Sequence, residues 1–273
     1  MEDPKTLKRN LLMFPLGTVG RDMIYNLFTN FIFTFILFTR GLSAAQLGAV
    51  SAIMIGARVF DALNDPIMGN IIERTRTRWG KYKPWLVIGI LSTSLVVYAV
   101  FNTRLTGWSF VWFFALIYFL YSITYTMHDI SFWGMVPALG TDAHVRDQIT
   151  ARTNLFAGIG GTIAGFFIPM LTTGSMTIGG NTAFAYGRVA LVICILAPAF
   201  LCFTIFGVHE RREENTAPVE PFSFRKIIDV FKGNDQLLWI ALIFLIQQVG
   251  NGIVLSGIGQ TYIYVEFGYE GIF

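Results

Sequence analysis

Long apolar stretches recur along the chain and are separated by short polar connections. We place these stretches near residues 11–39, 44–72, 85–103, 109–138, 152–173, 187–207 and 237–265. Each is long enough to cross about 30 Å of hydrocarbon as an α-helix. They do not alternate apolar and polar residues as membrane β-strands do. The pattern therefore predicts about seven transmembrane helices in an all-α integral membrane protein.

The composition also indicates that the bilayer is the solvent. Hydrophobic residues make up 54% of the 273 residues and charged residues only 14%, whereas soluble domains carry about 25% charged residues. The mean hydropathy is +0.58. These values exclude a disordered chain, a coiled coil, a disulfide scaffold and a nucleic-acid-binding arm. The first apolar stretch is too long for a cleavable signal peptide and lacks its cleavage site.

The basic residues are distributed unevenly between alternate connections. Fourteen of the 20 lysines and arginines lie in segments 1–10, 73–84, 139–151 and 208–236. The intervening connections contain only Arg40, Arg104 and Arg188. By the positive-inside rule, this asymmetry predicts a multi-pass protein of the cell (plasma or inner) membrane with a cytoplasmic N-terminus. The membrane topology is therefore enough to explain why these loops are basic, and no anionic ligand is needed to explain it.

The segment 208–236 is predicted to be a cytoplasmic linker. Its first part, up to residue 220, is polar, and its second part places Phe224, Ile227, Ile228 and Phe231 on one helical face. That spacing indicates a short amphipathic helix lying at the membrane surface. The linker separates six predicted spans in residues 1–207 from one span in residues 237–273.

Ionisable side chains inside the spans are the most informative feature for function. Each charge at mid-bilayer costs about 2.5–3.5 kcal/mol on insertion scales. The residues within or at the edge of spans are Arg21, Asp22, Arg58, Asp61, Asp65, Asp129 and Arg152. We expect them to face one another or a wet cavity rather than lipid.

The second span carries a polar face formed by Arg58, Asp61, Asn64 and Asp65. The two carboxylates are i, i+4 neighbours about 6 Å apart, and they repel each other by roughly 2.8 kcal/mol at an effective dielectric constant of about 20. A cation between them, or a proton on one of them, removes this repulsion. Because carboxylate and amide oxygens are ligands for hard cations, the pattern predicts a site for Na⁺, Li⁺ or H⁺. The alternative is an ion-pair cluster with Arg58 that only holds helices together.

The fourth span carries residues suited to a sugar. Asp129 and Trp133 are i, i+4 neighbours, so a carboxylate could accept hydrogen bonds from hydroxyls while the indole packs against the apolar face of the ring. Arg152 could pair with Asp22 or Asp129, or donate to a sugar hydroxyl. We expect His128 to have a structural role.

Small residues predict local features of two other spans. In the first span, Pro15, Gly17 and Gly20 are expected to loosen the helix, because interrupted helices often line transport sites. In the fifth span, small residues at every fourth position from Ala157 to Gly165 predict close packing against another helix.

Three motifs connect the chain to a known family. They are ARVFDALNDPIMG (57–69), RTRTRWGKYKPW (74–85) and TYTMHDISFWGMVP (124–137). In this order they resemble the glycoside–pentoside–hexuronide:cation symporters, the melibiose-permease-like group of the major facilitator superfamily. The resemblance extends from Gly20 through the seventh span and is specific to the family, though not to a substrate.

The resemblance implies a role for each motif residue. The coupling cation, a metal ion if sodium is used, would be bound by Asp61, Asn64, Asp65 and Thr126. The sugar would be bound by Asp22, Asp129, Trp133 and Arg152. A charge network and inner gate would comprise Arg21, Arg58, Arg74 and Arg78. No cofactor is implied besides the coupling ion Na⁺, Li⁺ or H⁺.

The length of the chain differs from the family pattern. The family fold has two six-helix bundles, whereas this chain ends at Phe273, about one span into the second. We expect an N-terminal six-helix bundle with the first helix of an incomplete C-terminal bundle, that is, a fragment whose missing C-terminal bundle is a required partner. Alone, such a chain should not transport, because alternating access needs two bundles.

The function expected of the intact protein is cation-coupled symport of a sugar or glycoside by alternating access. Its partners would be that substrate and the lipid bilayer, with no nucleic acid and no catalysis. One alternative is a sugar-binding sensor or half-transporter without flux. Another is an intramembrane prenyltransferase-like enzyme holding Mg²⁺-diphosphate at Asp61 and Asp65, although such enzymes need two aspartate-rich clusters and this chain has one.

Overall fold

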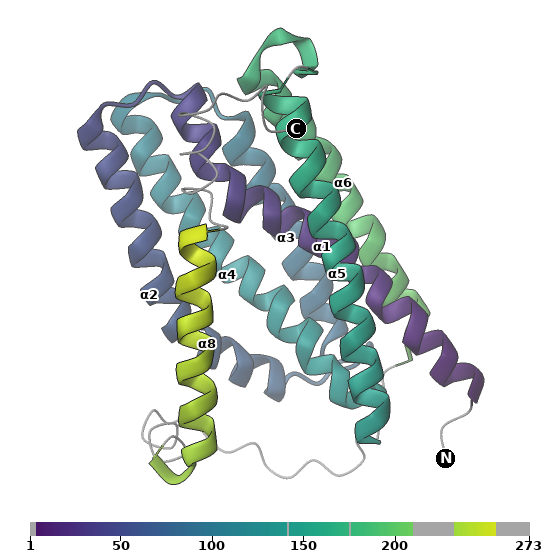
Figure 1. Ribbon diagram of the computed structural model, residues 1–273. Helices are drawn as coiled ribbons and strands as arrows, with labels where there is room; N and C mark the ends of the chain where they lie inside the picture. Colours follow the sequence, from purple (N-terminus) through teal and green to yellow (C-terminus); the bar gives the residue numbers. More distant parts are fainter. Residues whose placement is uncertain (1–3, 141, 175, 210–231, 255–273) are drawn as a thin grey trace.

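The computed structural model consists of long helices (Figure 1). It describes residues 4–140, 142–174, 176–209 and 232–254. Its elements are α1 (Pro4–Thr39), α2 (Ala44–Arg74), α3 (Lys83–Asn102), α4 (Gly107–Leu139), α5 (Ala143–Thr172), the short 3₁₀ helix η1 (Ile178–Gly180), α6 (Thr182–Gly207) and α8 (Asp235–Val254). These ranges contain no β-strand, which confirms the all-α fold class.

Six of the predicted spans are present as membrane-length helices. Among the described residues, α1 to α6 are each long and apolar enough to cross a bilayer. Helix α8 follows the predicted seventh span as far as Val254, and the rest of that span lies outside the described residues. Residues 222–231 of the predicted amphipathic helix also lie outside them.

Several helices begin earlier than the hydropathy pattern predicted. Helix α5 starts at Ala143 rather than near residue 152, and α6 starts at Thr182 rather than near 187. The side chains of Asp142 and Asn181 cap these helices by accepting hydrogen bonds from first-turn N–H groups, at 3.4 and 3.1 Å. Hydropathy identifies the part of a helix inside hydrocarbon, whereas the helix itself continues to its cap.

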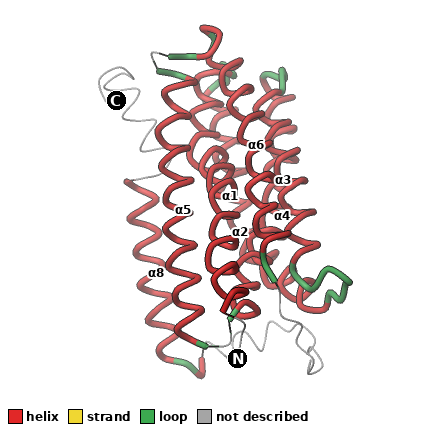
Figure 2. The backbone as a smooth tube through the Cα atoms, turned by 90° about the vertical axis from the view of Figure 1, so that its right-hand side faces the viewer, coloured by secondary structure: helices red, strands yellow, loops and turns green. Residues whose placement is uncertain are grey.

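The six helices pack as two similar groups of three. Helix α1 packs against α5 and α6, and helix α4 packs in the matching way against α2 and α3. Helices α3 and α6 complete the bundle by packing against each other. Helix α8 lies along one side of this bundle (Figure 2), and nearly all of its side chains up to residue 250 are exposed. This arrangement places α1 and α4 at equivalent positions, as in a three-plus-three repeat.

Aromatic side chains fill the space between α1 and α4. The ring centroids of Phe14 and Phe132 lie 4.3 Å apart, and those of Phe28 and Tyr121 lie 3.6 Å apart. Phe14, Phe28 and Phe132 are fully buried. These two helices carry the acidic residues singled out in the sequence, so the aromatic contacts fix how those residues face one another.

The first helix is not interrupted, contrary to the prediction from Pro15. It runs without a break from Pro4 to Thr39. Its glycines serve close packing instead, since a Cβ atom on Gly20 would lie 2.6 Å from the Cα atom of Ala197 on α6. Because glycine has no side chain, the backbones of α1 and α6 can approach closely at this position.

The small-residue stripe of α5 is displaced by one position from the predicted one. A side chain on Gly165 would meet nothing within 4 Å, whereas Gly160 lies directly against the backbone of Val19. Ala164, one turn further along, is 1% exposed. The correct face was ambiguous in the sequence because Gly160 and Gly161 are adjacent.

Replacing Gly20 with alanine is expected to destabilise the bundle by about 1–3 kcal/mol, because the new methyl group overlaps the α6 backbone. Gly158→Ala is the matched control, since a Cβ atom there meets nothing within 4 Å and alanine favours a helix. Thermal unfolding of both purified variants tests this. Equal unfolding temperatures would contradict the close α1–α6 packing.

Candidate functional site

Two hydrogen bonds join the acidic face of α2 to α4. Ser122 Oγ donates to Asp61 Oδ1, and Thr126 Oγ1 donates to Asp65 Oδ1 at 3.0 Å. Both pairs are separated by the same 61 positions along the chain. The i, i+4 pair of carboxylates is thus matched by an i, i+4 pair of hydroxyls on a helix that runs in the same direction. We refer to Asp61, Asn64, Asp65, Ser122 and Thr126 as the α2–α4 cluster.

The α2–α4 cluster is only partly neutralised by Arg58. Its Nη1 atom lies 3.7 Å from Asp61 Oδ2, and the Arg58 side chain is 57% exposed. Asp65 takes part in none of the salt bridges found in the described part of the chain. The ion-pair alternative therefore accounts for Asp61 and leaves Asp65 without a basic partner.

The carboxylate, hydroxyl and amide oxygen atoms of this cluster are ligands of the kind that a hard monovalent cation takes. The Asn64 Nδ2 atom is buried with no hydrogen-bond partner in the described ranges, and rotating the amide would present its oxygen instead. No group of three or more His, Cys, Asp or Glu able to hold a metal occurs among the described residues. Two carboxylates with hydroxyl and amide oxygens offer less negative charge than a paired aspartate-rich Mg²⁺ site.

A second cluster centres on Arg21 of α1. Its Nη2 atom lies 3.1 Å from Asp22 Oδ2, and its Nη1 atom lies 3.1 Å from Asp129 Oδ1 on α4. Thr18 Oγ1 also donates to Asp22 Oδ2 at 2.6 Å. The Arg21 side chain is 6% exposed, whereas that of Asp129 is 36% exposed. One buried cation therefore links two carboxylates, and one of the two retains an open edge.

Aromatic rings surround this second cluster. The Arg21 guanidinium carbon lies 4.9 Å from the ring centre of Phe132 and 5.3 Å from that of Trp133. Trp133 is partly exposed, whereas Phe132 is fully buried. An indole face beside an accessible carboxylate is the arrangement expected for a sugar site. We refer to Arg21, Asp22, Asp129 and Trp133 as the α1–α4 cluster.

Tyrosines lie near both clusters and were not identified from the sequence. The ring centroids of Tyr25 on α1 and Tyr125 on α4 lie 5.3 Å apart, and Tyr125 stacks on Tyr121 with ring centroids 5.5 Å apart. Ser122 was missed as well. The signal for it was available, because Ser122 and Thr126 repeat the spacing of Asp61 and Asp65.

Arg152 does not pair with Asp22 or Asp129 in the structure. It is exposed on α5, and its Nη1 atom donates to the carbonyl oxygen of Leu11 at 3.3 Å. Arg21 forms both ion pairs instead, because its helix directly faces α4. Sugar binding by Arg152 stays a prediction.

His128 is enclosed between α3 and α4. It is 0% exposed, and Gly89 lies so close that an added Cβ atom would be 2.7 Å from the backbone nitrogen of His128. Both ring nitrogens lack a hydrogen-bond partner in the described part of the chain. The side chain thus belongs to the packed interior, as expected for a structural histidine.

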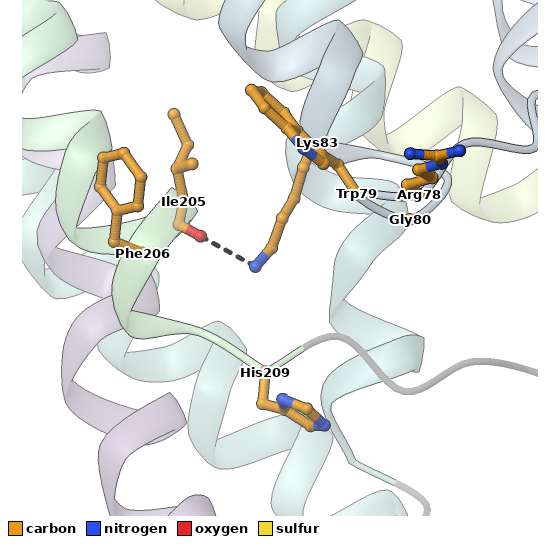
Figure 3. Close-up of a pocket in the computed structure, with 7 residues that line it drawn as sticks. All are labelled: Arg78, Trp79, Gly80, Lys83, Ile205, Phe206 and His209. Atoms are coloured by element: carbon orange, nitrogen blue, oxygen red, sulfur yellow. Dashed lines mark hydrogen bonds between the residues drawn. The ribbon is translucent and has the colours of Figure 1, made fainter.

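The basic motif after α2 lines a pocket at the end of the bundle (Figure 3). The pocket has a volume of about 340 Å³ and includes Arg78, Trp79 and Lys83. Lys83 Nζ donates to the carbonyl oxygens of Ile205 and Val208, each at 2.8 Å, and so caps the end of α6. Arg74 is exposed in the last turn of α2. The contacts anchor this loop to α6, and the gating role of the arginines stays a prediction.

Comparison with known proteins identifies similar sequences over nearly the whole chain. Residues 13–262 match the family described as MFS/sugar transport protein. The chain is 28% identical over 264 residues to the lactose permease of Lactobacillus helveticus, and this alignment covers 90% of this chain and 41% of the permease. It is 29% identical to the raffinose carrier protein of Pediococcus pentosaceus, and this alignment covers 90% of this chain and 40% of the carrier protein.

A third relative is the isoprimeverose transporter of Lactiplantibacillus pentosus, 26% identical over 85% of this chain and 47% of that protein. The chain spans about two fifths of the length of the first curated relatives it matches, 40–41% in each case. The match to a family of transport proteins agrees with the prediction that the chain is not an enzyme.

Proposed function

Because the chain belongs to the MFS/sugar transport protein family, we propose that it carries the cation and sugar sites of a cation-coupled sugar symporter. The observation that supports this most directly is the position of Thr126 and Asp129. They lie one turn apart on α4, and Thr126 bonds to Asp65 while Asp129 bonds to Arg21. A single rigid helix therefore connects the α2–α4 cluster to the α1–α4 cluster.

The α2–α4 cluster binds the coupling ion, which is Na⁺, Li⁺ or H⁺. A bound cation neutralises the repulsion between Asp61 and Asp65 and draws the Thr126 hydroxyl into its coordination shell. This fixes α4 against α2. The adjacent turn, which carries Asp129, is then held in one position relative to Arg21.

The α1–α4 cluster binds the sugar. The open edge of Asp129 accepts hydrogen bonds from neighbouring hydroxyls, the buried guanidinium of Arg21 donates to ring or hydroxyl oxygens, and the Trp133 indole packs on the C–H face. Arg152 of α5 is included in this proposal on the family resemblance alone, because in the structure its guanidinium donates to the carbonyl oxygen of Leu11. The relatives' names mention lactose, raffinose and isoprimeverose, so the substrate class we propose is a small oligosaccharide or glycoside.

Transport itself needs a second bundle. Alternating access moves one bundle against another around a site between them, so we propose flux for the assembly with a C-terminal bundle and sugar binding for this chain. The sparse positive charge at the end that carries Arg40, Arg104 and Arg188 supports an N-terminus on the cytoplasmic side of the cell membrane.

The test is reciprocal binding. The full chain in lipid nanodiscs is titrated with lactose or raffinose by calorimetry, in Na⁺, in Li⁺ and in choline, at two pH values. We expect one of these cations to raise sugar affinity about 5- to 150-fold, the range typical of coupled sites. Saturating sugar must raise the affinity for that cation by the same factor. Sugar affinity that is equal in all solutions would contradict the proposal.

A further inference from the structure

Arg40, Arg104 and Arg188, the three arginines at the end of the bundle away from the basic loops, line one pocket. Arg40 follows α1, Arg104 follows α3, and Arg188 lies in the second turn of α6. All three line a pocket of about 550 Å³, together with Asn102 and other residues. Its lining residues come from the chain just after α1, from the end of α3 and from the start of α6, and these helix ends lie at one end of the bundle (Figure 1). The sequence showed these arginines only as isolated exceptions to the charge asymmetry.

No acidic residue accompanies them. The connections 40–43, 103–106 and 173–181 contain no Asp or Glu, and none of the three arginines takes part in a salt bridge found in the described part of the chain. Arg40 packs on Phe35 at 4.6 Å, and Arg188 packs on Phe184 at 4.8 Å. The rings position the guanidinium groups, but they bring no net negative charge.

Arg40 is a buried cation in the wall of this pocket. The residue is 8% exposed, and its Nε atom is buried with no hydrogen-bond partner in the described ranges. Burial lowers the pKa of its guanidinium, since the charged form loses hydration without gaining an anion. Buried charges in proteins are normally paired. An anion in the pocket that Arg40 lines would balance this charge.

An apolar cavity adjoins this basic pocket. It has a volume of about 260 Å³ and is lined by α5 and α6 residues that include Phe167, Ile168 and Val192. Arg188 lines both cavities. The apolar cavity extends along the helices as far as Met23 and Ala164, towards the middle of the membrane-spanning segments. A ligand that touches both cavities must therefore carry an anionic head and an apolar chain.

We propose that this is a binding site for an anionic phospholipid, with its phosphate on Arg40, Arg104 and Arg188 and an acyl chain in the α5–α6 cavity. Guanidinium groups match phosphate oxygens in pairs of hydrogen bonds. Three arginines without a carboxylate favour a lipid of net negative charge over a zwitterionic one, whose amine would meet no acidic partner. The site is separate from the two clusters and does not depend on the proposed transport function.

The test measures lipid binding to the full chain in detergent by native mass spectrometry. The probes are dioleoyl phosphatidylglycerol, dioleoyl phosphatidylcholine, and two chain-free anions, glycerophosphoglycerol and inorganic phosphate. We expect phosphatidylglycerol to bind about tenfold more tightly than phosphatidylcholine, and the chain-free anions to bind more weakly than either lipid. The double variant Arg104→Gln/Arg188→Gln should weaken phosphatidylglycerol binding on the order of 10- to 30-fold, given about 1 kcal/mol for each basic residue near an anionic lipid surface.

Arg76→Gln is the matched control, because Arg76 is an exposed arginine in the loop after α2, outside the residues lining this pocket. It should change lipid affinity by less than about twofold, within the spread of exposed charge substitutions. The two altered pocket arginines are exposed, so the double variant should unfold at the wild-type temperature. Equal binding of both lipids, or equal losses in Arg76→Gln and the double variant, would overturn the proposal. Equal binding of inorganic phosphate and phosphatidylglycerol would overturn the lipid as the source of the anion.

Discussion

Replacing Asp129 with asparagine is expected to weaken sugar binding roughly 10- to 150-fold, the equivalent of one charge-assisted hydrogen bond of about 1.5–3 kcal/mol. The amide keeps the shape of the side chain but loses the charge that sugar hydroxyls and Arg21 both use. Arg21 retains its ion pair with Asp22, so the buried guanidinium is not left without a partner and the fold should persist. Calorimetric titration of the variant with lactose or raffinose provides the measurement.

Two comparisons make the Asp129 result specific. Cation affinity measured without sugar should stay within about threefold of wild type, because Asp65 keeps its own hydrogen bond from Thr126. Asp147→Asn removes an exposed carboxylate near the start of α5, outside both clusters, and should leave both affinities unchanged. Loss of cation and sugar binding together in Asp129→Asn would contradict the assignment of two separate clusters.

Asp65→Asn is expected to abolish the effect of the coupling cation on sugar affinity. Asparagine resembles the protonated carboxyl group, so it removes both the repulsion from Asp61 and the charge that a metal cation needs. Sugar affinity without cation should fall by less than about threefold, while the cation-dependent increase of about 5- to 150-fold disappears. Sugar titrations with and without the active cation measure both quantities in one experiment.

The neighbouring hydroxyl offers a graded control for the same site. Thr126→Ser keeps the oxygen that bonds to Asp65 and should retain cation coupling. Thr126→Val removes the oxygen while keeping nearly the same volume, so it should reduce coupling. A variant Asp65→Asn that still responds to the cation would show that the coupling ion binds elsewhere.

The site residues differ in how far sequence could identify them. The i, i+4 spacing of Asp61 and Asp65 placed both carboxylates on one face of α2, because that relation depends only on helix geometry. The partner of Asp129 could not be found in this way. Arg21 and Arg152 both lie within or at the edge of predicted spans, so the sequence did not distinguish them as partners. Only the packing of α1 on α5 and α6 placed Arg21 opposite α4.

Packing register shows the same limit. Gly160 and Gly161 are adjacent in the sequence, yet only Gly160 meets the backbone of α1, because the rotation of α5 is set by all its neighbours at once. The hydroxyl partners of the acidic pair also depended on register, since the match of Ser122 to Asp61 requires α2 and α4 to lie side by side.

The sequence by itself determined the all-helical membrane fold, the six spans from α1 to α6 and the uneven distribution of basic loops. These follow from hydropathy and charge, which act on each segment separately. Only the tertiary structure decided that Arg21 joins Asp22 to Asp129, and that Arg40, Arg104 and Arg188 share one pocket. Those contacts join segments far apart in the chain, and their geometry depends on how six helices fill space together.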